Sequence, residues 1–570
     1  MYQSSSVADH IAQAREQDSG SWTLPWNSFA EFFDSRVGDS ALASHPCLTY
    51  NDEDLATRRE YRYAEFGAAV ERMTAFLRDR AGLHRGERLA TVLFNHDLTA
   101  ILYFAAWRMG IAIVPINIEE STDKIRFILE DAECSALCCW HDRRDELLDL
   151  QSTLPGLRQI MIFTDTGYRV QADANPISER QPATAAAADL RPCSLDHEAL
   201  IVYTSGTTGP PKGVVLTMRN LLIDADAIAD WHRLGTNDRL MCVLPIHHVN
   251  GTVVTLVTPF YCKGSILLNR RFKSAGFWRT LEAEQITCVS VVPTLLEFLL
   301  DADEDVSRYR LNRFDGFICG AGPLLRETAA RFEDRFHFPI RHGYGLSETT
   351  CYCCFLPNDL SVEEHRHWLR DHEFPSIGVA LRHNRMAILD QEGRVLPESA
   401  RGEICIRGGT VCAGYFKRED ANQAAFQWGW FRSGDEGFYQ RDGKGRPFFF
   451  VSGRLKELII RGGVNISPLE IDDALKSHPL VRFAMAVPFD NRYYGEEIAA
   501  YVVPRDTVSP PTETDVLLHC RRSLPFSKCP KVVIFGTEVP YTSTGKPKRL
   551  ELKGRLAPSL ASYQDHQFRE

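Results

Sequence analysis

Short runs of apolar residues alternate with helix-like stretches along most of the chain, and this alternation limits the possible folds more than any other feature. The strand-like runs span residues 87–94, 111–116, 135–140, 159–163, 199–205, 239–245, 264–269, 288–292 and 316–322. Amphipathic stretches at 96–110, 274–285 and 324–336 lie between several of them. Apolar strands separated by amphipathic helices predict layered α/β structure with largely parallel sheets.

The pattern changes after about Gly402. The segments GEICIRG, WFRSGD and RPFFFVSG are short and strand-like, with glycine turns between them, and they predict an antiparallel β-rich subdomain. A smaller α+β unit follows, with a helix at 467–478 and strands at 482–489 and 497–504. We therefore expect a large N-terminal domain at 1–455, in which layered α/β subdomains join a β-rich subdomain. A small α+β C-terminal domain is expected at 456–570.

Charge and composition exclude several classes of function. The formal net charge of -10 disfavours a polyanion-binding surface, so we expect no nucleic-acid partner. No apolar run reaches the ~18 residues of a membrane span and the N-terminus lacks a signal-peptide pattern, so we expect a soluble, cytoplasmic protein. The cysteines are then expected to be buried, reduced thiols. The cluster Cys351, Cys353 and Cys354 has no second ligand pair at the spacing of a zinc site.

The segment YTSGTTGPPKGV, residues 203–214, is the strongest local signal of a binding function. Backbone amides of such a loop can converge on phosphate oxygens, while its hydroxyls and its lysine add hydrogen bonds and charge. It is not a P-loop, because the GK[ST] ending is missing and Pro210 and Pro211 oppose the start of a helix. The segment alone is compatible with a nucleotide loop or with a flexible polar hairpin.

Further motifs follow this loop in a fixed order. They are YGLSETT at 344–350, GEICIRG at 402–408, WFRSGD ending at Asp435, GRLKELIIRGGVNISPLEID at 453–472 and STGKPKR around Lys546. Together with the loop they resemble the signatures of the adenylate-forming superfamily, which includes acyl-CoA synthetases, peptide-synthetase adenylation domains and luciferases. Ser347 and Ser433 replace threonines of the family pattern and keep the hydroxyl. The segment near Tyr61 resembles the usual start of the large domain.

The resemblance implies two half-reactions. A carboxylate attacks the α-phosphorus of ATP and expels pyrophosphate, and a thiol then attacks the acyl adenylate. The implied cofactors are ATP, Mg²⁺ and coenzyme A, and the implied partner is a small carboxylic acid. In the family the small domain is mobile and rotates between the two steps. Lys456 matches the hinge position, and Gly462 and Gly463 would face the coenzyme A tunnel.

The same match implies roles for the nucleotide-binding residues. The β- and γ-phosphates would be bound by the loop residues Thr204, Ser205, Gly206, Thr207, Thr208, Gly209 and Lys212. Adenine would stack on Tyr344, with the backbone of Gly320, Ala321 and Gly322 beside it and with Gly345 and Ser347 in the same motif. The GAG run is not a dinucleotide fingerprint, because Leu325 occupies the place of its last glycine.

Four charged residues would carry the chemistry. Glu348 would hold Mg²⁺ between phosphate oxygens, and Asp435 would accept hydrogen bonds from both ribose hydroxyls. Arg454 would bind the ribose or a phosphate at the domain junction. Lys546 would be the catalytic lysine, because its ammonium can bridge the substrate carboxylate and the α-phosphate.

The acyl pocket is expected around PIHHVNG at 245–251. His248 matches a catalytic gating position, Asn250 and Gly251 would shape the pocket, and Ala321 would form its floor. The segment has no aspartate to bind an ammonium group, so an α-amino acid is disfavoured. The motifs look most like those of acyl-CoA synthetases acting on fatty, aryl or carnitine-like acids, which would place the chain in fatty acid or related metabolism.

Several alternatives remain open at this stage. Because no carrier domain follows Lys546, we expect a freestanding enzyme that uses coenzyme A, with loading of a separate carrier protein as the second reading. A luciferase-like oxidation is a third. A catalytically silent nucleotide-binding scaffold would be free to lose Glu348, Asp435, Arg454 or Lys546, yet all four are present. A homodimer is common in the family.

Overall fold

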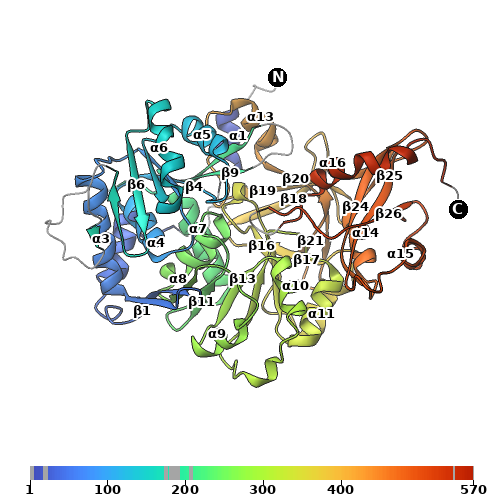
Figure 1. The fold of residues 1–570 in the computed structure, drawn as a ribbon, viewed down its shortest axis with the longest axis horizontal. Helices are drawn as coiled ribbons and strands as arrows, with labels where there is room; N and C mark the ends of the chain where they lie inside the picture. Colours follow the sequence, from blue (N-terminus) through green and yellow to red (C-terminus); the bar gives the residue numbers. More distant parts are fainter. Residues whose placement is uncertain are drawn as a thin grey trace.

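The structure, a computed structural model, describes residues 6–16, 23–171, 177–178, 193–204, 210–542 and 546–568. A large part built on two sheets carries a smaller part at its side, which begins after β21 and is drawn in orange and red (Figure 1). This arrangement confirms the expected fold class, a large α/β domain with a β-rich subdomain followed by a small α+β domain. The domain boundary at residue 456 stays a prediction.

The first sheet has the strand order β10-β9-β4-β3-β5-β6-β7-β8. Its strands are β3 (Arg88–Val92), β4 (Ala112–Ile116), β5 (Ala136–Trp140), β6 (Gln159–Thr164), β7 (Gly167–Val170), β8 (Ile177–Ser178), β9 (Glu198–Thr204) and β10 (Lys212–Thr217). The central pairs β3–β4, β3–β5, β5–β6 and β4–β9 are parallel, as the alternation of strands and helices predicts. β9 and β10 form an antiparallel hairpin around the phosphate-loop motif.

The second sheet has the order β18-β19-β20-β21-β17-β16-β15-β14-β13-β11-β12-β1-β2. Its strands are β1 (Pro46–Asp52), β2 (Thr57–Arg62), β11 (Arg239–Cys242), β12 (Ser265–Asn269), β13 (Cys288–Val291), β14 (Gly316–Cys319), β15 (Ile340–Tyr344), β16 (Cys354–Phe355), β17 (Ser376–Ala380), β18 (Asn384–Leu389), β19 (Gly402–Gly408), β20 (Phe431–Arg441) and β21 (Pro447–Arg454). The run from β15 to β1 is parallel. β18 to β21 are antiparallel, which confirms the expectation for β19 to β21 after Gly402, and β18 extends this pairing to residues before that point.

The described residues of the small part form a five-stranded sheet and three α-helices. β22 (Ile459–Arg461), β23 (Val464–Ile466), β24 (Val481–Asn491), β25 (Gly495–Pro504) and β26 (Val532–Phe535) form the sheet. The helices are α14 (Pro468–Lys476), α15 (Glu513–Cys520) and α16 (Arg549–Leu560). α14 begins at Pro468 because Ser467 caps it through a hydrogen bond from the Leu469 amide.

Helices cover both sheets of the large part. They include α2 (Phe29–Val37), α3 (Tyr63–Asp79), α4 (Asp97–Arg108), α5 (Thr122–Asp131), α6 (Arg144–Thr153), α7 (Met218–His232), α9 (Phe277–Ala283), α10 (Pro293–Asp301), α11 (Arg326–Phe336) and α12 (Val362–Arg370). α4 and α7 lie inside the large domain and are buried along most of their length. The predicted strand at 316–322 ends early, at Cys319, because Ala321 has a positive φ of 62° that no strand allows.

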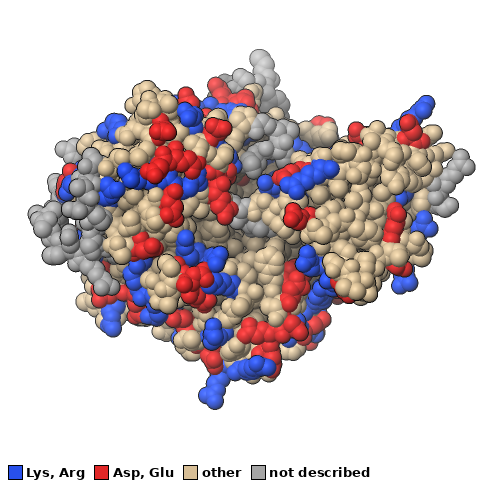
Figure 2. Space-filling model, viewed as in Figure 1, with Lys and Arg blue, Asp and Glu red and all other residues tan. Residues whose placement is uncertain are grey.

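The cysteines are free and mostly buried, as the sequence predicts. All sixteen cysteines are free thiols, and all except Cys262 are buried. On the face shown in Figure 2, Lys and Arg side chains are mixed with Asp and Glu side chains. Within the described residues, no helix has both the length and the apolar character needed to cross a membrane.

Candidate active site between the two domains

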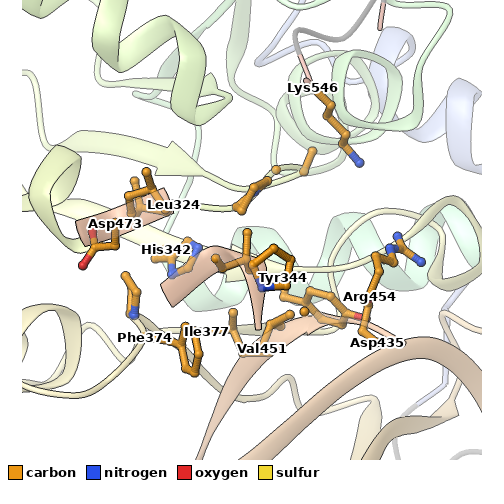
Figure 3. A pocket seen from close by; sticks show the side chains of 18 of the residues that line it. Leu324, His342, Tyr344, Phe374, Ile377, Asp435, Val451, Arg454, Asp473 and Lys546 are labelled. Carbon is orange, nitrogen blue, oxygen red and sulfur yellow. The ribbon is translucent and has the colours of Figure 1, made fainter. Parts of the chain in front are cut away.

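A cavity of about 210 Å³ lies where the small domain meets the large one (Figure 3). Seven of the predicted nucleotide-site residues line it: Ala321, Gly322, Tyr344, Gly345, Asp435, Arg454 and Lys546. They come from the loop after β14, from the end of β15 and the residue that follows it, from β20 and β21, and from the tail of the small domain. Residues more than two hundred positions apart in the sequence therefore share one cavity.

A cross-strand ion pair anchors one side of the cavity. Asp435 on β20 lies opposite Arg454 on β21 in the antiparallel register, and their Oδ1 and Nε atoms are 2.8 Å apart. The Tyr344 hydroxyl donates a hydrogen bond of 2.5 Å to the other carboxylate oxygen. Asp435 is 4% exposed, and its charge raises the pKa of Arg454. The carboxylate is thus held in one orientation beside the cavity.

Apolar side chains share the cavity with the Tyr344 ring. Phe374, Ile377 and Val451 line the same cavity and lie below and to the left of Tyr344 in Figure 3. Burial, and then the Asp435 charge, raise the pKa of Tyr344 well above its usual value, so the phenol stays a hydrogen-bond donor. A cavity that offers an aromatic ring, apolar side chains and a fixed carboxylate suits a purine base joined to a ribose.

Lys546 reaches the cavity from the small domain. Its side chain enters opposite Asp435 and Arg454 (Figure 3). Its backbone amide donates to Thr542 Oγ1 at 3.0 Å, and the Thr542 amide donates to the Lys546 carbonyl at 2.7 Å. Burial, with a contribution from Arg454, lowers the pKa of Lys546 to about 8, and Asp435 and Glu348 limit the fall. The ammonium therefore lies among charges of both signs.

The phosphate loop is framed by the β9–β10 hairpin. Thr204 ends β9 and pairs with Lys212 at the start of β10. The predicted residues Ser205, Gly206, Thr207, Thr208 and Gly209 lie outside the described residues. The Lys212 ammonium lies 5.1 Å from the centre of the Tyr415 ring, a cation–π distance. The base of the loop therefore contacts the β-rich subdomain.

Tyr415 joins the loop to the predicted Mg²⁺ ligand. Its hydroxyl donates to Glu348 Oε1 at 2.9 Å, so one ring links Lys212 and Glu348. Glu348 lies in a short 3₁₀ helix, Ser347–Thr349, which also contains Ser347. The described residues contain no group of three or more His, Cys, Asp or Glu side chains that could hold a metal alone. A single carboxylate still fits Mg²⁺, which commonly takes its remaining ligands from phosphates and water.

Asn250, one of the predicted acyl-pocket residues, lies in a buried polar cluster, whereas Ala321 lines the cavity described above. Asn250 donates to the Tyr352 hydroxyl at 3.2 Å and accepts a hydrogen bond of 2.6 Å from Ser290. It begins a π-helix, Asn250–Val257, and Gly251 follows because a Cβ there would lie 2.3 Å from the Pro245 carbonyl oxygen. Gly251 therefore has a packing role. Tyr352 and Ser290 complete the cluster.

Two adjacent histidines lie in the same segment. The rings of His247 and His248 are 4.5 Å apart. Burial lowers the pKa of His247 to about 4, while burial and then the neighbouring His247 and Lys546 lower that of His248 well below its usual value. Both rings are therefore neutral near pH 7. Among the described residues, His247 Nε2 is buried without a hydrogen-bond partner.

The residues predicted to form the hinge and the coenzyme A tunnel do not line the cavity. Lys456 is exposed in the turn between β21 and β22, where the Leu458 amide bonds to the Arg454 carbonyl. Gly462 and Gly463, with φ of 58° and 80°, form the exposed turn between β22 and β23. The structure brings Lys546 to the cavity and leaves these two glycines outside it, so their tunnel role stays a prediction.

The fold and this cavity define a class of nucleotide-dependent enzyme in which a small domain supplies a lysine to a large domain. The sequence model of the AMP-binding enzyme family matches residues 40–416, and that of the AMP-binding enzyme C-terminal domain matches residues 470–546. The chain belongs to the AMP-binding enzyme family, which is the adenylate-forming superfamily expected from the motifs.

Curated relatives and solved structures agree with this assignment. The chain is 35% identical over 474 residues to a sulfoacetate–CoA ligase of Cupriavidus necator, covering 83% of this chain and 88% of that protein. It is 30% identical to an oxalate–CoA ligase of Arabidopsis thaliana, covering 85% and 92%. ATP-bound MatB from Rhodopseudomonas palustris superposes with a TM-score of 0.80 at 26% identity, covering 93% and 99%. The chain is thus an acid–thiol ligase of the AMP-forming acyl-CoA synthetase type.

Proposed function

We propose that this ligase activates a short carboxylic acid as its acyl adenylate and transfers the acyl group to coenzyme A, releasing AMP and pyrophosphate. One observation carries the proposal. Lys546 of the small domain shares a cavity with Asp435 and Arg454 of the large domain, so a cation that can neutralise two anions faces a carboxylate that can bind a ribose.

In the adenylation step each group has a distinct role. Tyr344 and the apolar side chains that line the same cavity bind adenine, and Asp435 accepts hydrogen bonds from the ribose hydroxyls. The Lys546 ammonium draws the substrate carboxylate toward the α-phosphate and stabilises the charge that develops as the new bond forms. Arg454 supports the ribose or a phosphate from the other side of Asp435.

The phosphate loop, with Thr204 and Lys212 at its base, holds the β- and γ-phosphates until pyrophosphate leaves. Glu348, oriented by the Tyr415 hydroxyl, would hold Mg²⁺, which neutralises phosphate charge when bound. Transfer to coenzyme A then requires the small domain to turn at Lys456, so that Lys546 leaves and the turn with Gly462 and Gly463 approaches.

Three observations favour a short acid over the fatty, aryl or carnitine-like acids suggested by the motifs. Tyr352 is 1% exposed, and a Cβ on Gly320 would lie 2.6 Å from its ring, so this ring fills the space next to Gly320, the neighbour of Ala321 in the sequence. The names of the two relatives specify sulfoacetate and oxalate, which are two-carbon acids with a second acidic group. His247 Nε2, which has no hydrogen-bond partner within the described part of the chain, could form a buried hydrogen bond with such a group.

ATP–pyrophosphate exchange across a panel of acids tests this function. The panel contains acetate, oxalate, sulfoacetate, benzoate and octanoate, and coenzyme A is added to the acid that gives the fastest exchange. We expect the fastest exchange with a two-carbon acid and conversion to its thioester. Faster exchange with octanoate than with the two-carbon acids would refute the proposal that the substrate is a short acid. Exchange without thioester formation would indicate a carrier protein as the acceptor, and the absence of exchange with every acid would refute the activation step.

A further inference from the structure

Helix α11 of the large domain begins beside the cavity without a cap of its own. It starts at Arg326, shortly after Ala321 and Gly322, which line the cavity. Its N-cap residue is Leu325, which has no side-chain acceptor for the free amides of the first turn. These amides therefore need a partner from elsewhere.

Asp473, on helix α14 of the small domain, supplies that partner. Its Oδ1 accepts a hydrogen bond of 3.2 Å from the Glu327 amide, and its Oδ2 accepts one of 2.8 Å from Arg326 Nε. The Asp473 side chain is 9% exposed. A carboxylate is favoured at this place because the N-terminus of a helix carries partial positive charge. One domain thus caps a helix of the other.

A second ion pair joins the same two surfaces. Lys476 lies on α14 three residues after Asp473, and its Nζ is 3.1 Å from Glu297 Oε2 on helix α10 of the large domain. The Lys476 side chain is 5% exposed, and that of Glu297 is 18% exposed. A buried ammonium of this kind needs its carboxylate partner, because removing the partner leaves an uncompensated charge.

We propose that Asp473 and Lys476 are positioning residues that hold the small domain in the arrangement for adenylation. Both lie on α14, in the same domain as Lys546, so the contacts that cap α11 also fix where Lys546 enters the cavity. A turn of the small domain at Lys456 breaks both pairs and leaves α11 uncapped. The pairs therefore favour the first half-reaction and oppose the departure of Lys546. This inference rests on the proposed two-step function.

Separate measurement of the half-reactions tests the positioning role. Asp473→Asn should slow ATP–pyrophosphate exchange by about tenfold, because a hydrogen bond to a charged group is worth roughly a factor of ten or more in an equilibrium. Thioester formation from supplied acyl adenylate and coenzyme A should stay within about twofold or rise. When Arg326→Gln is combined with Asp473→Asn, it should slow exchange little further, because Arg326 and Asp473 take part in one shared interaction.

The matched control is Asp303→Asn. Asp303 accepts a hydrogen bond of 2.6 Å from Arg335. Arg335 lies on α11, as Arg326 does, but Asp303 and Arg335 both belong to the large domain. This variant should leave both half-reactions unchanged. Equal loss of both half-reactions in Asp473→Asn, or no loss in either, would overturn the proposal.

Hydrogen exchange of the substrate-free protein gives a readout that does not depend on activity. Asp473→Asn should speed amide exchange in residues 326–336 and in 468–476, whereas Asp303→Asn should leave the second segment unchanged. Unchanged exchange in both segments of Asp473→Asn would overturn the docking role. If the wild-type protein activates no acid, the proposed ligase reaction fails, while hydrogen exchange still decides whether Asp473 docks the domains.

Discussion

Lys546 should set the alkaline limit of the adenylation half-reaction. Burial, assisted by Arg454, lowers the pKa of Lys546 from 10.5 to about 8. Only the protonated amine can bridge two anions, so the active fraction should fall from ~90% at pH 7 to ~10% at pH 9. The kcat/KM for adenylation reports groups of the free enzyme, and it should therefore fall about tenfold per pH unit above pH 8. Bound ATP adds negative charge and raises the pKa, so kcat should fall at higher pH than kcat/KM.

ATP–pyrophosphate exchange between about pH 6 and pH 10 measures this limit. Lys546→Met should lower the exchange rate by roughly 10²- to 10³-fold at pH 7.5, the usual effect of losing one charge-stabilising group. Lys546→Arg keeps its charge at every pH tested, so its remaining activity should show no fall near pH 8. The same alkaline fall in the wild type and in Lys546→Arg would refute this reasoning, as would full activity of Lys546→Met.

Three further changes test other parts of the site. Glu348→Gln should raise the Mg²⁺ concentration for half-maximal exchange by about tenfold, because a neutral amide is a weaker ligand, and an unchanged Mg²⁺ titration would contradict its assigned role. Lys456→Pro, which fixes φ at the turn between β21 and β22, should slow thioester formation from supplied adenylate more than exchange; equal loss would argue against a hinge there. Tyr352→Ala should raise the kcat/KM for octanoate relative to that for oxalate by about tenfold, because it removes the ring that fills this space. The ratio of the two values does not change when part of the protein is unfolded. An unchanged ratio would remove Tyr352 from the acyl pocket.

Much of the large domain follows from local pattern. Apolar runs separated by amphipathic helices predict parallel strands, and β3, β4, β5 and β6 pair in this way. The motifs identify Tyr344, Asp435, Arg454 and Lys546, which line one cavity. These features can be predicted because each depends on residues close together in sequence or on a motif that fixes its own backbone geometry.

Other parts of the site depend on long-range packing. Tyr415 reaches Glu348 because the Ala413 amide bonds to the Val215 carbonyl and the Phe416 amide to the Gly213 carbonyl, a pairing between segments about two hundred residues apart. No local periodicity indicates such a bridge. The role of Asp473 cannot be predicted from local sequence either. An acidic residue on an amphipathic helix usually faces solvent, whereas the partner of Asp473 is the Glu327 amide of the other domain.

The most direct test of the central claim is the nucleotide product of a single turnover. Enzyme in excess over labelled ATP, with oxalate or sulfoacetate and coenzyme A, should give one AMP and one pyrophosphate for each thioester, with an acyl adenylate detectable before coenzyme A is added. Formation of ADP and phosphate would contradict activation at the α-phosphate, and so would thioester formation in Lys546→Met at the wild-type rate.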